Sequence, residues 1–159
     1  MERVVRRLIE RNETISTMES CTGGGLVNAI TNIPDASRVI KYSAVTYSNE
    51  YKIKMGVDST LIDMYSVYSM EVAHSMAKTI SNYANSTYGV GITGKLKKVD
   101  ENNLSGEDDV VFLSIYDRES DEFYDSEIRV HHDTRVDNKN EVIETFIEKF
   151  LEMTKNHIK

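Results

Sequence analysis

The stretch Glu19-Ser20-Cys21-Thr22-Gly23-Gly24, with a third glycine at Gly25, is the most informative part of this sequence. It follows residues 14–18 (TISTM), which are typical of a β-strand, and precedes an apolar run at residues 26–30 that can continue as a helix. A strand-to-helix turn of this kind exposes a small hydroxyl residue, and the first amides of the helix have no partner within the helix. Such amides favour a phosphate or a developing oxyanion. Tight packing explains the same glycines equally well, so the turn alone does not establish a site.

The rest of the sequence predicts one α/β domain over residues 1–159. Apolar periodicity and capping residues predict an N-terminal helix that ends at residues 12–13, a helix from about 22 that stops before Pro34, and helices at about 49–55, 69–83 and 138–155. Asp58 or Ser59 is expected to cap another short turn. Runs of β-branched and aromatic residues predict strands at 14–18, 38–48, 87–93, 110–116 and 127–131. This order predicts a three-layer α/β/α sandwich with a mixed, mostly parallel sheet and a C-terminal antiparallel hairpin.

Composition argues against several kinds of partner. Of the 159 residues, 40% are hydrophobic and 28% are charged, which suits one domain with a buried core. A formal net charge of -7 argues against nucleic acid, because that binding needs a basic face. No apolar run approaches the ~20 residues that span a membrane, so no membrane partner is expected. The single cysteine, Cys21, cannot form an internal disulfide, which favours the cytoplasm.

A second stretch carries a candidate base for the serine. The predicted strand ends with Val45-Thr46-Tyr47-Ser48, and Asn49-Glu50-Tyr51-Lys52 follows. If Asn49 is the N-cap, Lys52 lies in the first helical turn, where the helix dipole and burial both disfavour a charged ammonium. A neutral lysine can act as general base to a serine hydroxyl, and Tyr47 can hydrogen-bond either group. A capped helix with a solvated lysine is the commoner explanation of such a lysine in isolation.

Together, the two stretches resemble the CinA C-terminal domain family, the nicotinamide-nucleotide amidohydrolases. Gly56-Val57, residues 67–73 (VYSMEVA) and Ile92-Thr93-Gly94 resemble the continuation of the same pattern. The resemblance covers residues 14–94 and weakens afterwards. The length of the chain resembles the stand-alone form of the family, without the N-terminal domain that many members carry.

The resemblance implies hydrolysis of nicotinamide mononucleotide to nicotinate mononucleotide and ammonia in pyridine-nucleotide salvage. It implies a small-molecule nucleotide as substrate, no cofactor, no metal, and a homodimer. Ser20 would be the nucleophile, Lys52 the base and Tyr47 the supporting hydroxyl. The residues that would contact substrate are Glu19, Cys21, Thr22, Gly23, Gly24, Asn49, Thr93, Gly94 and Arg135.

Two departures from the family pattern leave alternatives open. Residues 95–103 (KLKKVDENN) stand where a Gly/Pro-rich loop is usual, and their lysines Lys95, Lys97 and Lys98 either contact a phosphate or are solvated. Asp133-Thr134-Arg135 stands where Gly-Asp-Arg is usual, and Lys139 where a second arginine is usual. The alternatives are a catalytically weakened nucleotide-binding or interaction module of the same fold and a serine amidase for another small amide.

Two further features are expected to have no catalytic role. Cys21 has no histidine near it in sequence, which favours a small buried filler over a catalytic thiol. His131-His132 is predicted to lie on a strand, where adjacent side chains face opposite ways, so no metal site is expected there.

Overall fold

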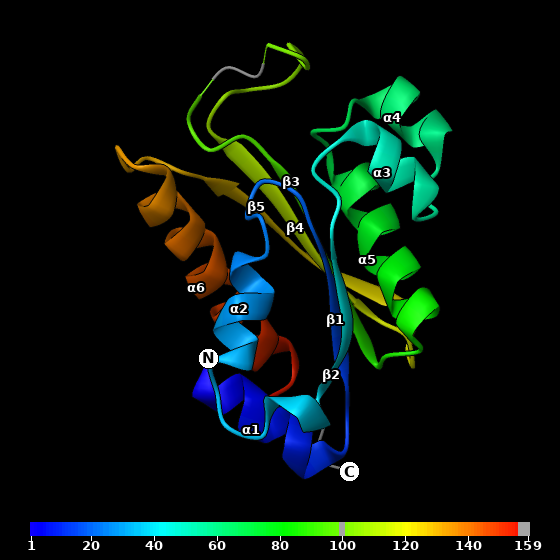
Figure 1. The fold of residues 1–159 in the computed structure, drawn as a ribbon, viewed down its shortest axis with the longest axis vertical. Coiled ribbons are helices and arrows are strands. Elements are labelled where there is room, and N and C mark those ends of the chain that lie inside the picture. Colours follow the sequence, from blue (N-terminus) through cyan, green and yellow to red (C-terminus); the bar gives the residue numbers. More distant parts are fainter. Residues whose placement is uncertain (99–100, 156–159) are drawn as a thin grey trace.

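The computed structural model describes residues 1–98 and 101–155, and its centre is a five-stranded mixed sheet (Figure 1). The strand order is β2-β1-β3-β4-β5. β1 pairs in parallel with β2 and with β3, whereas the β3–β4 and β4–β5 pairs are antiparallel. The strands are β1 (Ile15–Glu19), β2 (Ile40–Val45), β3 (Tyr88–Gly94), β4 (Val110–Asp117) and β5 (Glu122–Arg129).

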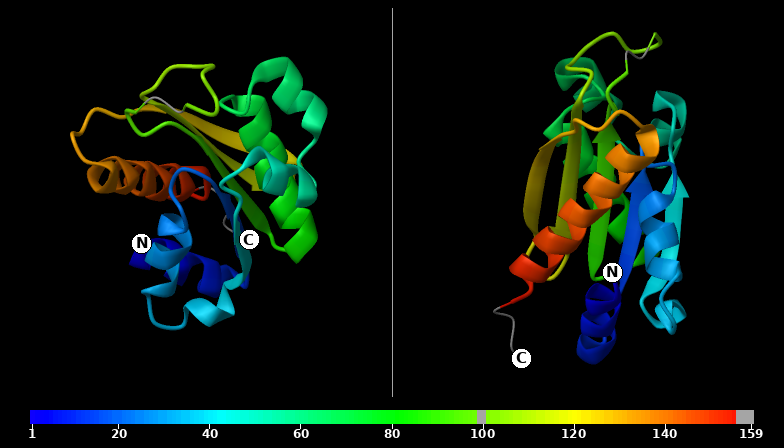
Figure 2. Two further views of the ribbon diagram at one scale, coloured as in Figure 1. Left: turned by 45° about the horizontal axis from the view of Figure 1, so that its top comes forward. Right: turned by 90° about the vertical axis from the view of Figure 1, so that its left-hand side faces the viewer.

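Helices cover both faces of this sheet (Figures 1 and 2). One face carries α1 (Glu2–Arg11), α2 (Gly25–Thr31) and α6 (Arg135–Met153). The other carries α5 (Met70–Ala84), with α3 (Asn49–Lys54) and α4 (Ser59–Tyr65) beside one of its ends, and a 3-10 turn, η1 (Ala36–Arg38), precedes β2. The predicted three-layer sandwich with a C-terminal hairpin is confirmed.

Each face of the sheet has its own apolar core. The larger one joins the sheet to α1, α2 and α6 and includes Leu8, Leu26 and Phe146, all fully buried. The smaller one packs Met18 of β1 against Met76 and Ile80 of α5. Within the described residues, no helix has the length and apolar character needed to cross a lipid bilayer.

Several predicted boundaries near the glycine turn were wrong. α2 begins at Gly25 rather than near Thr22, because Gly23 and Gly24 have φ angles of 60° and 93° that a right-handed helix does not allow. β2 is shorter than residues 38–48 because Ala36–Arg38 form the 3-10 turn and Ser48 caps α3. The segment after Asp58 is a complete helix, α4, capped by the Asp58 side chain.

Boundaries near the C-terminus also differ from the prediction. β5 begins at Glu122, five residues before the predicted start, because the hairpin turn is short and continues the ladder from Asp117↔Glu122. It ends at Arg129, so His131 lies outside the strand. α6 begins at Arg135 instead of Asn138, because the Thr134 side chain caps it. Tyr83 lies on the apolar stripe from which the helix at 69–83 is predicted, but its side chain is 65% exposed.

Two glycines let α5 lie directly on β3. A Cβ atom on Gly89 would lie 2.0 Å from the carbonyl oxygen of Ala77, and one on Gly91 would lie 2.2 Å from that of Ala73. Both distances are far below van der Waals contact, and the atoms they meet belong to the helix backbone. β3 therefore requires glycine at these positions, and its end, where Gly94 lies, is fixed relative to α5.

Gly91→Ala should destabilise the protein strongly, because neither the strand nor the helix backbone can move away from the added methyl group. We expect the free energy of unfolding, measured by urea denaturation, to fall by about 3 kcal/mol or more. Gly25→Ala is the matched control, because its Cβ would lie 3.5 Å from Ile143 Cδ1, an ordinary contact. A loss for Gly91→Ala no larger than for Gly25→Ala would contradict the close approach of α5 to β3.

Candidate active site

The candidate site lies at the edge of the sheet where parallel strands end. β1 and β2 run in register to Glu19↔Val45, so Ser20 and Thr46 leave the sheet side by side. The amide of Ser20 donates to Ile92 O of β3 at 3.1 Å, and the amide of Thr46 donates to Glu19 O at 2.8 Å. The carboxyl ends of parallel strands are where open α/β sheets commonly bind ligands.

A buried amine meets the predicted nucleophile at this edge. Lys52 Nζ lies 3.0 Å from Ser20 Oγ and donates to Thr46 O at 2.6 Å. Lys52 is only 1% exposed, and no carboxylate lies within ion-pairing distance of it in the described part of the chain. Burial lowers the pKa of Lys52 to about 8, against a smaller opposing attraction to Cys21. The predicted Ser20–Lys52 juxtaposition is present in the structure.

The helix that carries Lys52 is capped by Ser48 and not by Asn49. The Ser48 hydroxyl accepts from the Tyr51 amide, and Asn49 is the first helical residue. The cap explains why the chain turns sharply after β2 and directs Lys52 back toward Ser20. With Ser48 as the cap, Lys52 is the fourth residue of α3 and belongs to its last turn, so the predicted place in the first turn is wrong.

Glu19 does not face a ligand, although it was predicted to contact substrate. Its side chain is fully buried, and its carboxylate accepts from Thr22 Oγ1 at 2.7 Å, Leu26 N at 2.9 Å and Val27 N at 3.0 Å. Leu26 and Val27 supply the first free amides of α2, so an internal carboxylate occupies the helix N-terminus. The expectation that these amides bind an external anion is therefore wrong.

Some backbone amides of the glycine turn, residues 20–25, remain available to a ligand and others do not. The Gly23 amide donates to Ser20 O at 2.9 Å and the Gly25 amide to Thr22 O at 3.0 Å. The amides of Cys21, Thr22 and Gly24 have no hydrogen-bond partner among the described residues. These three, and not Gly23, are the turn amides available to a developing oxyanion.

An open cavity of about 850 Å³ lies beside Ser20. Its volume is within the range of sites for small organic ligands. Six of the predicted site residues line it: Ser20, Cys21, Tyr47, Asn49, Gly94 and Arg135. Cys21 is buried, and its burial raises the pKa of the thiol to about 12, which fits the predicted filler and not a thiolate nucleophile.

Other predicted contacts are not part of the cavity wall. Thr93 is fully buried, and its hydroxyl donates to Val67 O at 2.8 Å, because the side chain points from β3 toward the loop before α5. Thr22 is also buried, with its hydroxyl bound to Glu19. Gly23 and Gly24 shape the turn behind Ser20, and a Cβ on Gly23 would lie 3.5 Å from Lys139 Nζ.

Tyr47 contacts neither Ser20 nor Lys52 through its hydroxyl. The ring is 64% exposed, and the hydroxyl accepts from Arg135 Nη2 at 3.3 Å. The side chain crosses to the start of α6, while the Lys52 amine binds the preceding carbonyl, Thr46 O. The predicted hydrogen bond to the serine–lysine pair is therefore absent from the described structure, and Tyr47 faces the cavity together with Arg135.

The three lysines after Gly94 have three different surroundings. Lys95 is 4% exposed, pairs with Asp108 at 3.1 Å and lies over the Tyr68 ring. Lys97 is exposed and donates to His131 O at 3.2 Å, away from the cavity, whereas Lys98 lines the cavity. The same loop adds Glu101, Asn102 and Asn103 to the wall, and Asn103 Oδ1 accepts from Asn49 at 3.2 Å. The contact between Asn103 and Asn49 of α3 could not be predicted, because the loop that contains Asn103 is polar and has no periodic pattern.

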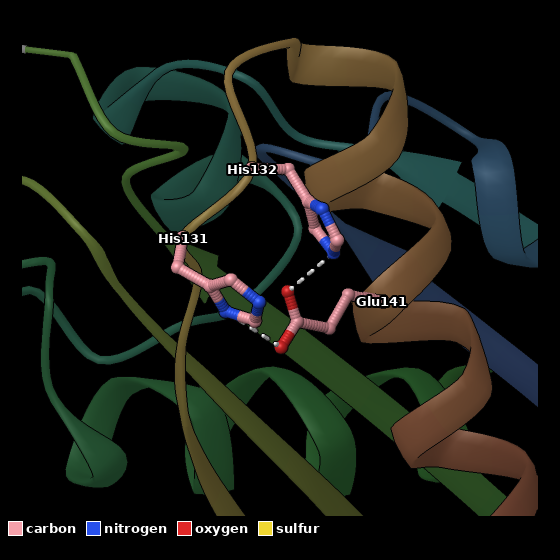
Figure 3. Close-up of side chains that lie close together, drawn as sticks. All are labelled: His131, His132 and Glu141. Atoms are coloured by element: carbon pink, nitrogen blue, oxygen red, sulfur yellow. Dashed lines mark ion pairs between the residues drawn. The ribbon is translucent and has the colours of Figure 1, made fainter.

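The prediction that His131 and His132 face opposite ways was wrong. β5 ends at Arg129, so strand alternation does not apply to them. Both rings face Glu141 of α6 (Figure 3), and they stack with centroids 4.5 Å apart.

The geometry defines a class of protein, an α/β sandwich with a buried serine–lysine pair at the carboxyl edge of its parallel strands. Over residues 1–156 the chain matches the family model described as the CinA C-terminal domain, and it belongs to that family. It is 45% identical over 94 residues to a protein of Alkaliphilus oremlandii named as competence-damage inducible, covering 58% of this chain and 23% of that one. A similarly named Clostridium kluyveri protein is 38% identical over 120 residues, covering 74% and 29%. The chain thus spans about a quarter of the length of these curated relatives.

Solved structures share the fold along nearly the whole chain. The competence/damage inducible protein CihA of Agrobacterium tumefaciens superposes with a TM-score of 0.83 at 25% identity, covering 96% of this chain and 94% of that one. The competence damage-inducible protein A (ComA) of Klebsiella pneumoniae superposes with a TM-score of 0.88 at 20% identity, covering 98% and 94%. These neighbours agree with the family assignment and confirm the fold class.

The buried amine should give the protein a distinctive dependence of stability on pH. The folded pKa of Lys52 is lowered to about 8 from its ordinary 10.5, so between these values the unfolded chain holds more protons. The free energy of unfolding of the wild type, relative to Lys52→Met, should therefore rise with pH. We expect a rise of about 1 kcal/mol between about pH 7 and pH 9 by urea denaturation.

Lys54→Met is the control for this measurement, because it removes an exposed amine from the same helix. Its stability relative to the wild type should not change with pH over this range. Identical pH dependence of wild type and Lys52→Met would mean that the Lys52 amine is solvated.

Proposed function

We propose that this protein is a serine amidohydrolase that converts nicotinamide mononucleotide and water to nicotinate mononucleotide and ammonia. The observation that carries the proposal is the 3.0 Å contact of Lys52 Nζ with Ser20 Oγ, in surroundings that lower the pKa of the amine. The resemblance of the motifs around both residues to nicotinamide-nucleotide amidohydrolases supports the choice of substrate. The cavity beside Ser20 supports a small organic ligand.

The chemistry follows from the protonation state of Lys52. A neutral amine can donate one hydrogen to Thr46 O and accept the Ser20 proton on its lone pair. Ser20 Oγ then attacks the carboxamide carbon, and the free turn amides of Cys21 and Thr22 stabilise the oxyanion. The protonated Lys52 returns its proton to the departing nitrogen, which leaves as ammonia. Water, deprotonated by Lys52, hydrolyses the acyl ester and restores Ser20.

Charged side chains in the cavity wall support recognition of the nucleotide phosphate. Arg135 and Lys98 line the cavity, and Tyr47 holds the Arg135 guanidinium by a hydrogen bond. A planar guanidinium binds phosphate through two parallel hydrogen bonds. Arg135 is the group we assign to the phosphate.

A nucleotide-binding module without turnover is the second candidate. The loop after Gly94 favours it, because the Lys95 amine is engaged by Asp108 and Glu101 adds an acidic group to the cavity wall. Calorimetry with nicotinamide mononucleotide would then detect binding, while ammonia release would be missing. A serine amidase for another amide would instead show labelling of Ser20 by an acylating probe, without action on this nucleotide.

Ammonia release from nicotinamide mononucleotide tests the leading proposal. We expect turnover by the wild type and a loss of about 10³-fold or more in kcat for Ser20→Ala, because Ser20 carries the hydroxyl that contacts the Lys52 amine. Ser16→Ala is the matched control, because Ser16 lies in β1, the strand that leads to Ser20, is fully buried, and its hydroxyl has no hydrogen-bond partner among the described residues. Release by the wild type that does not exceed release by Ser20→Ala would reject the proposal.

The pH dependence of kcat/KM tests the role of Lys52. A base must be neutral to act, so the rate should rise with pH to a plateau, with a midpoint near the lowered pKa of about 8. Lys52→Met should lose about 10²- to 10⁴-fold and also lose this ascending limb. If the Lys52→Met variant keeps the same midpoint in its pH dependence of kcat/KM, the midpoint belongs to another titrating group.

A further inference from the structure

A second cluster of chemically reactive side chains lies outside the candidate active site. His131 and His132 belong to the connection between β5 and α6, and Glu141 lies in the second turn of α6. Figure 3 shows both imidazole rings directed at the Glu141 carboxylate, one toward each oxygen. Neither the serine–lysine pair nor the proposed nucleotide contacts use these residues.

Each histidine lies within ion-pairing distance of Glu141, but neither forms a hydrogen bond with it among the described residues. His131 Nδ1 lies 3.6 Å from Glu141 Oε1, and His132 Nε2 lies 3.3 Å from Glu141 Oε2. Hydrogen bonds between nitrogen and oxygen are about 2.7–3.2 Å long. Glu141 Oε2 is buried and has no hydrogen-bond partner among the described residues. A buried carboxylate oxygen in this state needs a partner to offset its loss of water.

The same spacing fits the ligands of one metal ion. Bonds of about 2.0–2.2 Å to zinc put neighbouring tetrahedral ligand atoms about 3.3–3.6 Å apart. The two measured separations match this value, and one ligand atom from each of the three residues lies within 4.8 Å of the others. Two imidazoles and one carboxylate suit zinc and its neighbours among the transition metals, and not magnesium or calcium.

The backbone that carries the histidines is held in place. The buried Asn138 side chain accepts from the His132 amide at 2.9 Å and donates to His132 O at 3.2 Å. Lys97 donates to His131 O at 3.2 Å, and Thr134 caps α6. His131 is 72% exposed, so an ion reaches the cluster directly from solvent. Only side-chain rotations are then needed to close the ligand set.

We propose that His131, His132 and Glu141 bind one divalent transition metal ion of the zinc class, with water completing its coordination. The ion would join the β5–α6 connection to the second turn of α6. Arg135, which lines the cavity, lies between these two attachment points. The site therefore braces the start of α6 and does not depend on the proposed amidase activity.

Titration of the untagged protein with zinc chloride in a non-coordinating buffer tests the site. Isothermal calorimetry should give one saturable equivalent per chain, and the melting temperature should rise with zinc because the ion binds only the folded cluster. His131→Ala, His132→Ala and Glu141→Gln should each weaken binding at least about tenfold and remove the rise in melting temperature.

Two histidine variants serve as controls. His74→Ala removes a ring that contacts a single carboxylate, Asp125, on the opposite face of the sheet. His157→Ala tests the one histidine that lies outside the described residues. Both should bind one equivalent as the wild type does.

Cobalt(II) distinguishes a built site from weak surface binding. A cobalt-loaded wild type should show the strong visible absorption of four- or five-coordinate cobalt, and Glu141→Gln should not. Absence of saturable zinc binding, or binding that persists unchanged in all three ligand variants, would overturn the proposal. Ammonia assays do not enter this test, so its outcome is separate from that of the proposed amidase.

Discussion

The buried carboxylate of Glu19 is the interaction on which the candidate active site depends. It accepts hydrogen bonds from the hydroxyls of Thr17 and Thr22 and from the Leu26 and Val27 amides. A buried carboxylate without such donors would cost several kcal/mol, whereas a fully bonded one ties its partners together. Here it joins the end of β1, the glycine turn and the start of α2. The turn that carries Ser20 is therefore fixed both to the end of β1 and to the start of α2.

Unlike Glu19, Lys52 lowers the stability of the fold, and we assign it a chemical role instead. The side chain fills a closed space beside β1 with a group whose charge the surroundings disfavour. At neutral pH this arrangement stabilises the fold less than an apolar side chain of the same volume would. A group that is retained despite such a cost, and that touches a serine hydroxyl at the mouth of a cavity, has the properties of a catalytic base. The same reasoning does not apply to Lys54 on the exposed side of the helix.

The start of α6 links the two parts of the molecule to which we assign ligands. Arg135 reaches the cavity and holds Tyr47, while Asn138 and Glu141, farther along the helix, face the histidines of the preceding connection. Any contact that orders this connection also limits where the Arg135 guanidinium can lie. Because Thr134 caps α6, the first turn of the helix is well defined, and a change in the β5–α6 connection acts directly on the position of Arg135.

The fold class could be predicted from the sequence because apolar periodicity, glycines and capping residues act within a few neighbours along the chain, whereas the serine–lysine pair was predicted from the resemblance of its two motifs to the CinA C-terminal domain family. Parallel strands then bring the ends of β1 and β2 together, which made the Ser20–Lys52 contact predictable from its two local segments. Three contacts could not be predicted in this way: Glu19 accepts from the first amides of α2, Tyr47 accepts from Arg135, and His131 and His132 both face Glu141. Those contacts depend on side-chain directions between segments far apart in sequence or beyond a strand end. A shift of one residue in such a boundary redirects every side chain that follows it.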